Sequence, residues 1–183
     1  MTNTPHSQSR PDWSPDGNFV LFQQTSSEAN FDLWYVAMHD GRKLAPFRET
    51  KYQEFGGRFS PNSKWVAYTS DETRRQEIWV ESFLASAVRQ QVSIDGGLDP
   101  VWSRDGQELF YRSPGGNLMA VPVRHDATVV RFGTPTVLFP IGPQAYDVSL
   151  DRKEILTLAN LRASDVSPLT LFLNWRQKLE RRP

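Results

Sequence analysis

The 183-residue sequence contains no cysteine, and this absence excludes several kinds of chemistry together. A chain without thiols forms no disulfide, builds no thiolate metal site and offers no cysteine nucleophile. Proteins without disulfides occur in the cytosol and also in the bacterial periplasm, so the cysteine content leaves the compartment open.

Long apolar runs and an excess of one charge are also missing. No run of about 18 apolar residues occurs, so a membrane-spanning helix is not expected. Lysine and arginine together number 21, aspartate and glutamate also number 21, and the formal net charge is zero. Nucleic acids and anionic membranes attract basic surfaces. The sequence therefore predicts neither nucleic-acid binding nor membrane insertion by this chain.

Residues suited to metal binding or catalysis are few and scattered. The three histidines are His6, His39 and His125. They are expected in a tail, a turn and a loop, without partners at the spacing of metal ligands. No Asp-x-Asp-x-Asp array indicates calcium, and no Gly-x-Ser-x-Gly segment marks a serine nucleophile. We therefore expect no catalytic residue, no metal and no cofactor.

What the sequence does contain is a motif that recurs four times. Its copies are residues 11–17, 57–63, 100–106 and 146–152. The large apolar position of the motif is occupied by Trp13, Phe59, Trp102 and Val148. The intervals between these positions are 46, 43 and 46 residues. A fixed period in this range is the mark of stacked supersecondary units.

Each copy of the motif is predicted to form a turn between two strands. In the first copy Pro15 presets the backbone for a type I turn, and Gly17 suits its last position. Short runs of aromatic and branched residues follow, such as 18–22 and 32–36, and a more variable run closes each unit. Such runs are typical of strands. One unit therefore predicts a four-stranded antiparallel sheet of roughly 45 residues, which is the size of a β-propeller blade.

The period divides the chain into a lead-in, four blades and a tail. The expected bounds are 1–9 for a disordered lead-in, 10–50, 51–94, 95–139 and 140–175 for the blades, and 176–183 for a charged tail. The fold class is all-β, because no segment shows sustained helical periodicity. Four blades can close a ring or form an open arc of a larger one. An open arc exposes the faces of its terminal sheets and favours a partner or a homodimer.

The repeat resembles the TolB-type, WD-repeat-like β-propeller. The matching segments are Trp13-Ser14-Pro15-Asp16-Gly17 with 32–36, Phe59-Ser60-Pro61 with 77–80, and Trp102-Ser103 with Asp105-Gly106. The resemblance implies a propeller fold and a protein or peptide partner. It also implies a periplasmic or other extracytoplasmic location, with a cytoplasmic location still open.

The end of the chain carries a narrower likeness. Residues 146–149 and 168–175 are similar to the last blade of the propellers attached to bacterial serine/threonine protein kinases. In such proteins the propeller is a sensor or docking region that follows the kinase. This sequence has no Gly-rich loop and no His-Arg-Asp or Asp-Phe-Gly kinase motif. The likeness therefore implies a non-catalytic, signalling portion.

A candidate site follows from the place of the motif within a blade. The innermost strand of each blade lines the central channel, so residues beside the repeat aromatic are expected near the channel mouth. These residues are Asp12, Arg58, Asp99, Val101 and Asp147. Three acids and one arginine can bind a peptide or a small polar ligand. The alternative is that these side chains only pair with one another and with solvent.

Three functions follow as hypotheses. The leading one is a non-catalytic module for protein–protein interaction or ligand sensing, within a bacterial signalling or envelope protein. The second is a carbohydrate-active or peptidase-associated propeller fragment that uses the carboxylates of the channel mouth. The third is self-association through open blade edges, in which a dimer completes the ring.

Overall fold

The chain folds almost entirely into β-strands. The computed structural model describes residues 7–25, 30–85, 88–125, 129–143, 145–149, 154–158 and 169–173. These segments contain sixteen strands and one 3-10 turn at Asp40–Arg42, which confirms the all-β prediction. Within them, no helix has the length and apolar character needed to cross a lipid bilayer.

The first two sheets each have four antiparallel strands that pair in chain order. Sheet 1 consists of β1 (Gln8–Trp13), β2 (Phe19–Thr25), β3 (Phe31–Ala37) and β4 (Leu44–Arg48). Sheet 2 consists of β5 (Glu54–Phe59), β6 (Trp65–Ser70), β7 (Glu77–Ser82) and β8 (Arg89–Gln91). Gln8 and Ser9 pair with β2, so residues 8–9 of the predicted lead-in are part of sheet 1. The predicted tail at 176–183 lies outside the described residues.

The other two sheets depart from the predicted four strands. Sheet 3 consists of β9 (Leu98–Trp102), β10 (Glu108–Arg112), β11 (Asn117–His125), β12 (Val130–Phe132) and β13 (Thr136–Pro140). Strand β11 is long enough to pair with β13 along its first half and with β12 along its second. Sheet 4 consists, within the described residues, of β14 (Tyr146–Val148), β15 (Glu154–Leu158) and β16 (Leu169–Leu173).

The repeat aromatic holds the same place in every sheet. The backbone partners are Trp13 with Val20, Phe59 with Val66, Trp102 with Leu109, and Val148 with Ile155. In each pair the second residue follows the first by the same interval. The four copies of the motif therefore encode equivalent inner hairpins, as the period predicts.

The serine of the motif holds each turn together. Ser14 Oγ accepts the Phe19 amide at 2.9 Å and donates to Asp16 Oδ1 at 2.6 Å. The serines of the second and third turns make equivalent pairs of contacts. In the fourth turn Ser149 Oγ accepts the Glu154 amide at 3.0 Å. This last hairpin therefore forms although its motif lacks both proline and glycine.

Apolar clusters fill the spaces between consecutive sheets. The cluster between sheets 1 and 2 contains Leu21, Leu33, Phe59, Val66, Tyr68 and Phe83. The cluster between sheets 2 and 3 includes Trp65, Ile78, Val80, Trp102, Leu109 and Val121. The cluster between sheets 3 and 4 includes Phe110, Leu118, Leu138 and Ile155. Sheets 2 and 3 thus bury both faces, as stacked blades require.

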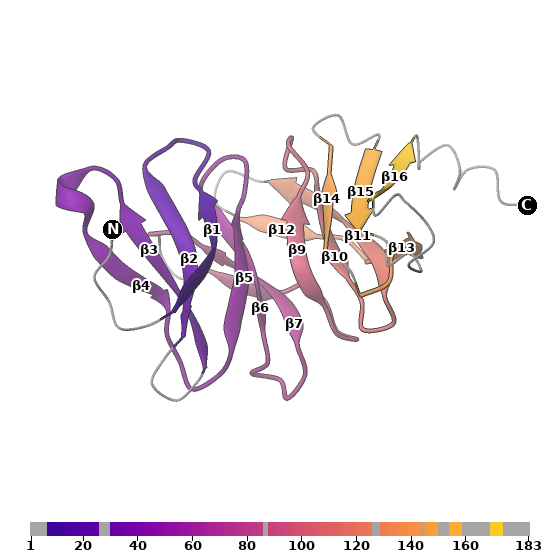
Figure 1. The fold of residues 1–183 in the computed structure, drawn as a ribbon, viewed down its shortest axis with the longest axis horizontal. Coiled ribbons are helices and arrows are strands. Elements are labelled where there is room, and N and C mark those ends of the chain that lie inside the picture. The colour runs from indigo at the N-terminus through magenta and orange to yellow at the C-terminus, as the bar shows by residue number, and fades with distance from the viewer. Residues whose placement is uncertain are drawn as a thin grey trace, which may run out of the picture.

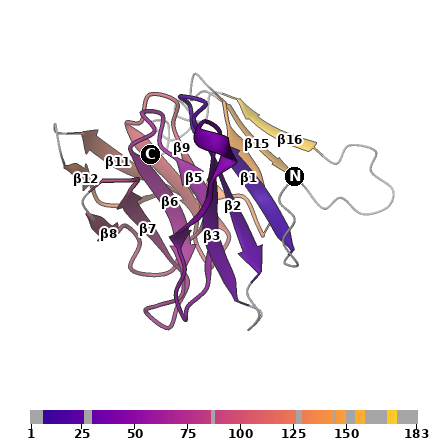
Figure 2. The ribbon, with the colours of Figure 1, turned by 90° about the vertical axis from the view of Figure 1, so that its left-hand side faces the viewer.

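The four sheets form an open arc. Sheets 1 and 4 lie at opposite ends of the molecule, and the inner strands β5 and β9 lie between them (Figure 1). Seen from the sheet 1 end, β8 and β12 fan out on one side of the view and β15 and β16 on the other (Figure 2). Of the two predicted arrangements, the chain adopts the open arc and not the closed four-blade ring.

Candidate functional site

A cavity of about 560 Å³ lies where the inner strands converge. Its lining includes Asp12 of β1, Arg58 of β5, Val101 of β9 and Asp147 of β14. These are four of the five residues that the sequence places at the channel mouth. Residues of the repeat turns, Arg104 among them, line the same cavity. The cavity is therefore at the end of the channel where the repeat turns lie.

The fifth predicted residue, Asp99, lies further along the channel. It lines a second cavity of about 370 Å³ together with Arg10 and Arg112. Arg58 and Tyr146 line both cavities. The two cavities are therefore neighbouring parts of one channel, and Asp99 is separated from the mouth.

Asp12 links sheet 1 to sheet 2 inside the channel. Its Oδ1 lies 3.2 Å from Arg58 Nη1, and its Oδ2 accepts the Phe59 amide at 2.8 Å. Burial raises the pKa of Asp12, although the Phe59 amide and the Arg58 charge partly oppose this rise. The carboxylate is thus held in place by the neighbouring blade.

Asp99 is enclosed by two arginines. Arg10 Nη1 lies 2.7 Å from Asp99 Oδ1, and Arg112 Nη2 lies 2.8 Å from Asp99 Oδ2. Burial acts to raise the pKa of Asp99, but hydrogen bonds and charge from the two arginines outweigh it, so the pKa is lowered. Because Arg10 belongs to β1, this group joins sheet 1 to sheet 3 across the channel.

A β-bulge in each of the first three inner strands positions these groups. Arg10, Gly56 and Asp99 each precede the repeat aromatic by the same number of residues, and their φ angles are +51°, +66° and +54°. The strand register shifts at each of these places. Bulges change the direction of side chains, and the left-handed conformation costs a non-glycine residue about 1–2 kcal/mol. Arg10 and Asp99 both adopt this left-handed conformation at the place where their side chains form an ion pair.

Tyr146 closes the channel wall on the side of sheet 4. Its hydroxyl donates to the Asp99 carbonyl at 2.7 Å. Burial, reinforced by the negative charge of Asp99, raises the pKa of Tyr146 well above its ordinary value. The phenol therefore stays protonated and acts as a hydrogen-bond donor that ties β14 to β9.

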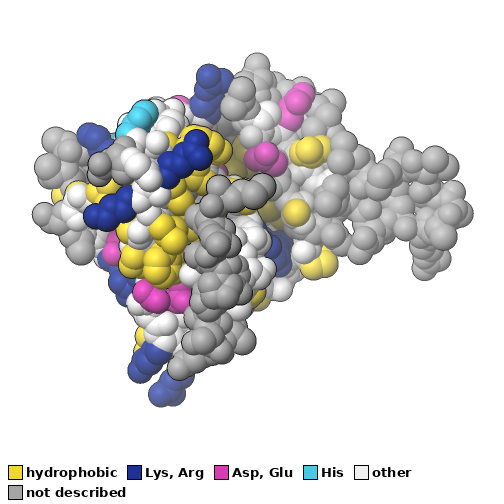
Figure 3. Space-filling view, turned by 60° about the vertical axis from the view of Figure 1, so that its left-hand side comes forward, with side chains coloured by type: hydrophobic (Ala, Val, Ile, Leu, Met, Phe, Trp, Pro, Cys, Tyr) yellow, Lys and Arg dark blue, Asp and Glu magenta, His cyan; other side chains and the backbone are white. Residues whose placement is uncertain are grey.

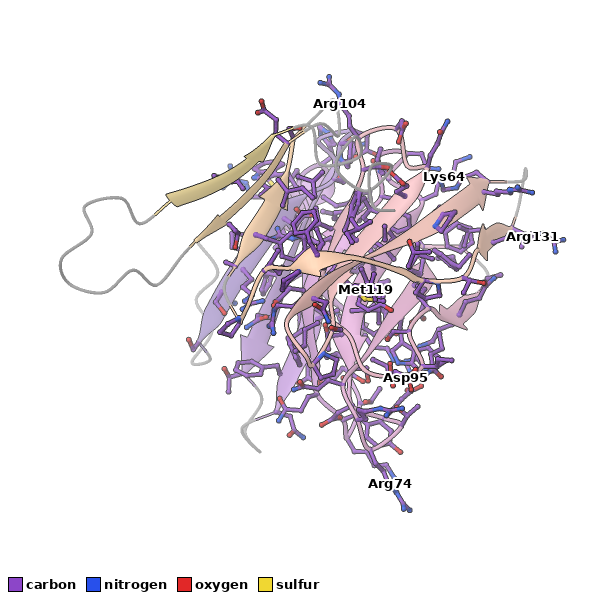
Figure 4. The ribbon with its side chains drawn as sticks, turned by 90° about the vertical axis from the view of Figure 1, so that its right-hand side faces the viewer. Lys64, Arg74, Asp95, Arg104, Met119 and Arg131 are labelled. Carbon is purple, nitrogen blue, oxygen red and sulfur yellow. The ribbon has the colours of Figure 1, made fainter. Side chains whose placement is uncertain are left out.

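The rim of the mouth carries the more accessible charges. Asp147 is exposed, and its Oδ1 accepts the Val148 amide at 2.8 Å. Arg104 is exposed and occupies the turn position that holds proline in the first motif. Arg104 and Lys64 lie at one end of the molecule and Arg74 at the other (Figure 4). The charges of Asp147 and Arg104 are accessible to a ligand, whereas the carboxylates of Asp12 and Asp99 are paired with arginines.

Sequence reasoning missed Arg10, Arg112, Arg104 and Tyr146. Arg104 had a usable signal, because it replaces a turn proline at the motif itself. Arg112 lies on β10, the second strand of its sheet, and the sequence pattern predicts channel residues only on the first strand of each sheet. Among the described residues, no group of three or more histidine or acidic side chains is arranged to hold a metal ion. The cavity lining combines these charged and aromatic side chains with small apolar ones such as Val101 and Val148.

Comparison with known proteins bears on the fold of the chain. No known protein-family profile matches the chain. A stretch of 94 residues is 32% identical to the Tol-Pal system protein TolB of Anaeromyxobacter dehalogenans (strain 2CP-C), and it covers 50% of this chain and 21% of that protein. The similarity therefore spans about a fifth of that relative.

Three solved structures share the fold. TolB from Acinetobacter baumannii has a TM-score of 0.64 at 16% identity, covering 90% of this chain and 40% of that one. The Cps50 (Swd1) β-propeller domain from Myceliophteria thermophila has a TM-score of 0.57 at 19% identity, covering 89% and 55%. A putative 6-phosphogluconolactonase from Bacteroides uniformis ATCC 8492 has a TM-score of 0.56 at 18% identity, covering 84% and 48%.

These similarities confirm the β-propeller fold and the resemblance to TolB-type and WD-repeat-like propellers. The chain spans about half the length of the structures it matches, or less in the case of TolB. The narrower likeness to propellers attached to protein kinases is untested by these matches and stays a prediction.

Proposed function

We propose that the chain is a non-catalytic propeller module that binds another protein by holding a peptide segment at the channel mouth. One observation carries the proposal: the cavity brings Asp147 and Arg104 to one rim, with Phe59, Val101 and Trp102 in its wall. Ligand sites are concave, mostly apolar, and carry a few convergent polar groups. A cavity of about 560 Å³ falls within their usual range of roughly 300–1,000 Å³.

The channel mouth also offers a rigid setting for recognition. Asp12, Arg58 and Tyr146 are each fixed by contacts between different sheets. Groups that are already ordered lose little entropy on binding, so such a site favours affinity. Asp147 and Arg104 then supply opposite charges at the rim, which orient a peptide and set specificity.

A peptide library provides the test. A phage-displayed library of random peptides is selected on the immobilised chain, and the dissociation constants of enriched peptides are measured by calorimetry. We expect Arg104→Ala and Asp147→Ala to weaken binding about tenfold each, which corresponds to about 1.4 kcal/mol. Arg74→Ala, an exposed arginine at the opposite end of the molecule, is the matched control. Enriched peptides that bind all four proteins equally would refute a site at the mouth.

The second candidate is an enzyme that uses the same carboxylates, and the similarity to a putative lactonase favours testing it. Glycoside cleavage needs one protonated carboxyl and a second one acting as base or nucleophile. Asp12 and Asp99 are instead paired with arginines, which weighs against this chemistry. A panel of sugar lactones and glycans is the assay. Turnover by the natural chain that disappears in Asp12→Ala and Asp147→Ala would favour the enzyme over the binding module.

The TolB-type resemblance supports a place outside the cytoplasm, in a bacterial envelope protein. Fractionation of cells that produce the protein naturally, followed with a specific antibody, measures this directly. Recovery with periplasmic or extracellular marker proteins agrees with the proposal. Recovery with cytoplasmic markers alone contradicts it, and it leaves the binding role of the channel mouth unaffected.

A further inference from the structure

The interfaces between consecutive sheets have two sides, and among the described residues no other sheet packs on the front side of sheet 1. The front of a sheet is the face that carries the repeat aromatic, and it packs on the preceding sheet. Phe59 and Trp102 are 6% and 9% exposed there, whereas Trp13, at the equivalent position of sheet 1, is 57% exposed. The Trp102 indole also donates to the Arg58 carbonyl of the preceding sheet at 3.2 Å. Trp13 therefore occupies the position of an interface residue, but none of the described sheets packs on it.

In the part of the chain that the structure describes, no further sheet packs on the back side of sheet 4. On the second strand of each sheet, the residue paired with the channel position lies on the back face. These residues are Leu21, Ala67, Phe110 and Leu156, the partners of Asp12, Arg58, Val101 and Asp147. The first three are completely buried against the next sheet, and Leu156 is 37% exposed. The last sheet thus presents the complementary half of the same interface.

The front of sheet 1 is an apolar surface. Val20, Trp34, Val36 and Leu44 share this face with Trp13 through the strand register, and all four are partly exposed. Figure 3 shows hydrophobic side chains gathered on this end of the molecule, bordered by basic and acidic ones. Contiguous apolar surface of this kind marks an interaction site.

We infer that the front of sheet 1 binds the back of sheet 4 from a second copy of this chain. The two faces are the two halves of the interface that already occurs three times, between sheets 1 and 2, 2 and 3, and 3 and 4. A contact between different faces of identical chains closes into a ring or grows into a filament, depending on the rotation between copies.

The size of the arc favours closure at two copies. Most of this chain superposes on 55% of the Swd1 β-propeller domain. A second copy therefore supplies about the other half of a ring of that size. In the closed dimer two identical interfaces form about one axis, and Trp13 of each copy packs on the last sheet of the other. This inference goes beyond the proposed peptide binding, and it stands or fails separately.

Light scattering after gel filtration, over a series of concentrations, gives the mass of the assembly. We expect twice the 21.0 kDa of the chain. Trp13→Lys and Leu156→Glu are each expected to weaken the dimer about 30-fold or more, since a buried tryptophan anchor contributes at least about 2 kcal/mol. Both residues are exposed in the single chain, so both variants should fold, which circular dichroism checks. Ile94→Glu, at an exposed loop residue, is the control and should remain dimeric.

Mixing the two variants makes the test specific for front-to-back contact. A Trp13→Lys chain keeps an intact back face, and a Leu156→Glu chain keeps an intact front face. The mixture should therefore recover a dimer held by one natural interface and one lysine–glutamate interface. A natural chain that is strictly monomeric, a mass that keeps growing with concentration, or a dimer that survives both substitutions would each overturn the inference.

Discussion

At the residue scale, Glu54 is a fully buried carboxyl at the start of β5. One oxygen accepts the Thr50 hydroxyl at 2.6 Å and lies 4.0 Å from Arg48 Nε. The other oxygen has no hydrogen-bond partner in the part of the chain that the structure describes. Burial raises the pKa of Glu54 to about 7; Asp32 adds to this rise, and Thr50, Arg48 and Arg89 oppose it.

This raised pKa makes stability depend on pH. Between pH 4.5, the ordinary pKa of a glutamate, and about pH 7, Glu54 is protonated in the folded chain and ionised in the unfolded chain. The stabilisation is therefore complete below the lower value and is lost as pH rises through the upper one. A shift of this size corresponds to about 3 kcal/mol.

Glu54→Gln should remove this pH dependence, because a neutral amide replaces a carboxyl that must otherwise ionise while buried. Urea denaturation from about pH 5 to about pH 8 measures the effect. We expect the natural chain to lose stability across this range and the variant to lose little. At the upper end the variant should be more stable by about 2 kcal/mol. Asp95→Asn, at an exposed site, should leave the natural slope unchanged, and an unchanged slope in Glu54→Gln would disprove the assignment.

At the scale of single elements, the inner hairpins were predictable because their signal is local. Each of the first three turns uses a serine hydroxyl and a short acceptor side chain two residues later, and the motif supplies both. The channel positions Asp12, Arg58, Val101 and Asp147 were predictable for the same reason, since they lie beside the repeat aromatic on a strand with alternating faces. Periodicity alone therefore predicted the four inner hairpins and four of the residues that line the cavity at the channel mouth.

Other elements depend on contacts that no local pattern encodes. Strand β12 was not predicted, because the second half of β11 begins at Pro122, and proline weakens a strand assignment. The structure places Pro122 opposite Glu108, and its carbonyl accepts the Gly133 amide. Phe83 lies in the loop after β7, and its ring packs on the Phe59 ring with 4.9 Å between the ring centroids. The pairing of β12 and the burial of Phe83 both depend on contacts with residues outside the local segment.

The bulge in β5 contains two glycines with different physical roles. Gly56 has a φ of +66°, and a Cβ there would approach nothing closer than 3.7 Å. A Cβ on Gly57 would lie 2.6 Å from Leu21 Cδ2 and 3.1 Å from Leu33 Cδ2. The first glycine is therefore needed for its conformation, and the second for the close packing of sheets 1 and 2.

Alanine substitution should separate these roles. Gly56→Ala is expected to cost about 1–2 kcal/mol of unfolding free energy, the price of a left-handed alanine. Gly57→Ala should cost about 1–3 kcal/mol by overpacking, and Leu21→Val in the same chain should recover part of that loss. Chemical denaturation measures each value, with Gly115→Ala, where a Cβ finds space at an ordinary φ, as control. A cost for Gly57→Ala that Leu21→Val leaves unrelieved would contradict the packing account.

At the scale of the whole molecule, stability should follow the number of covered faces. The apolar clusters join consecutive sheets, and the Arg10–Asp99 ion pair adds one contact between sheets 1 and 3. The free energy of the arc should therefore be close to a sum of terms for the sheets and for their interfaces. Among the described residues, sheets 2 and 3 have two interfaces each, and sheets 1 and 4 have one. The terminal sheets should therefore open more often than the interior ones.

Hydrogen exchange of backbone amides tests this order and its link to self-association. In dilute solution the amides of β6 should exchange at least about tenfold more slowly than those of β2 and β15, because one further interface must break before β6 opens. Raising the concentration should slow β2 and β15, since a second copy then covers their free faces, while β6 changes little. In Trp13→Lys that slowing should disappear, although the order in dilute solution persists. Equal protection of all four sheets in dilute solution would mean that the arc unfolds as one cooperative unit, and the description by neighbouring interfaces would then be wrong.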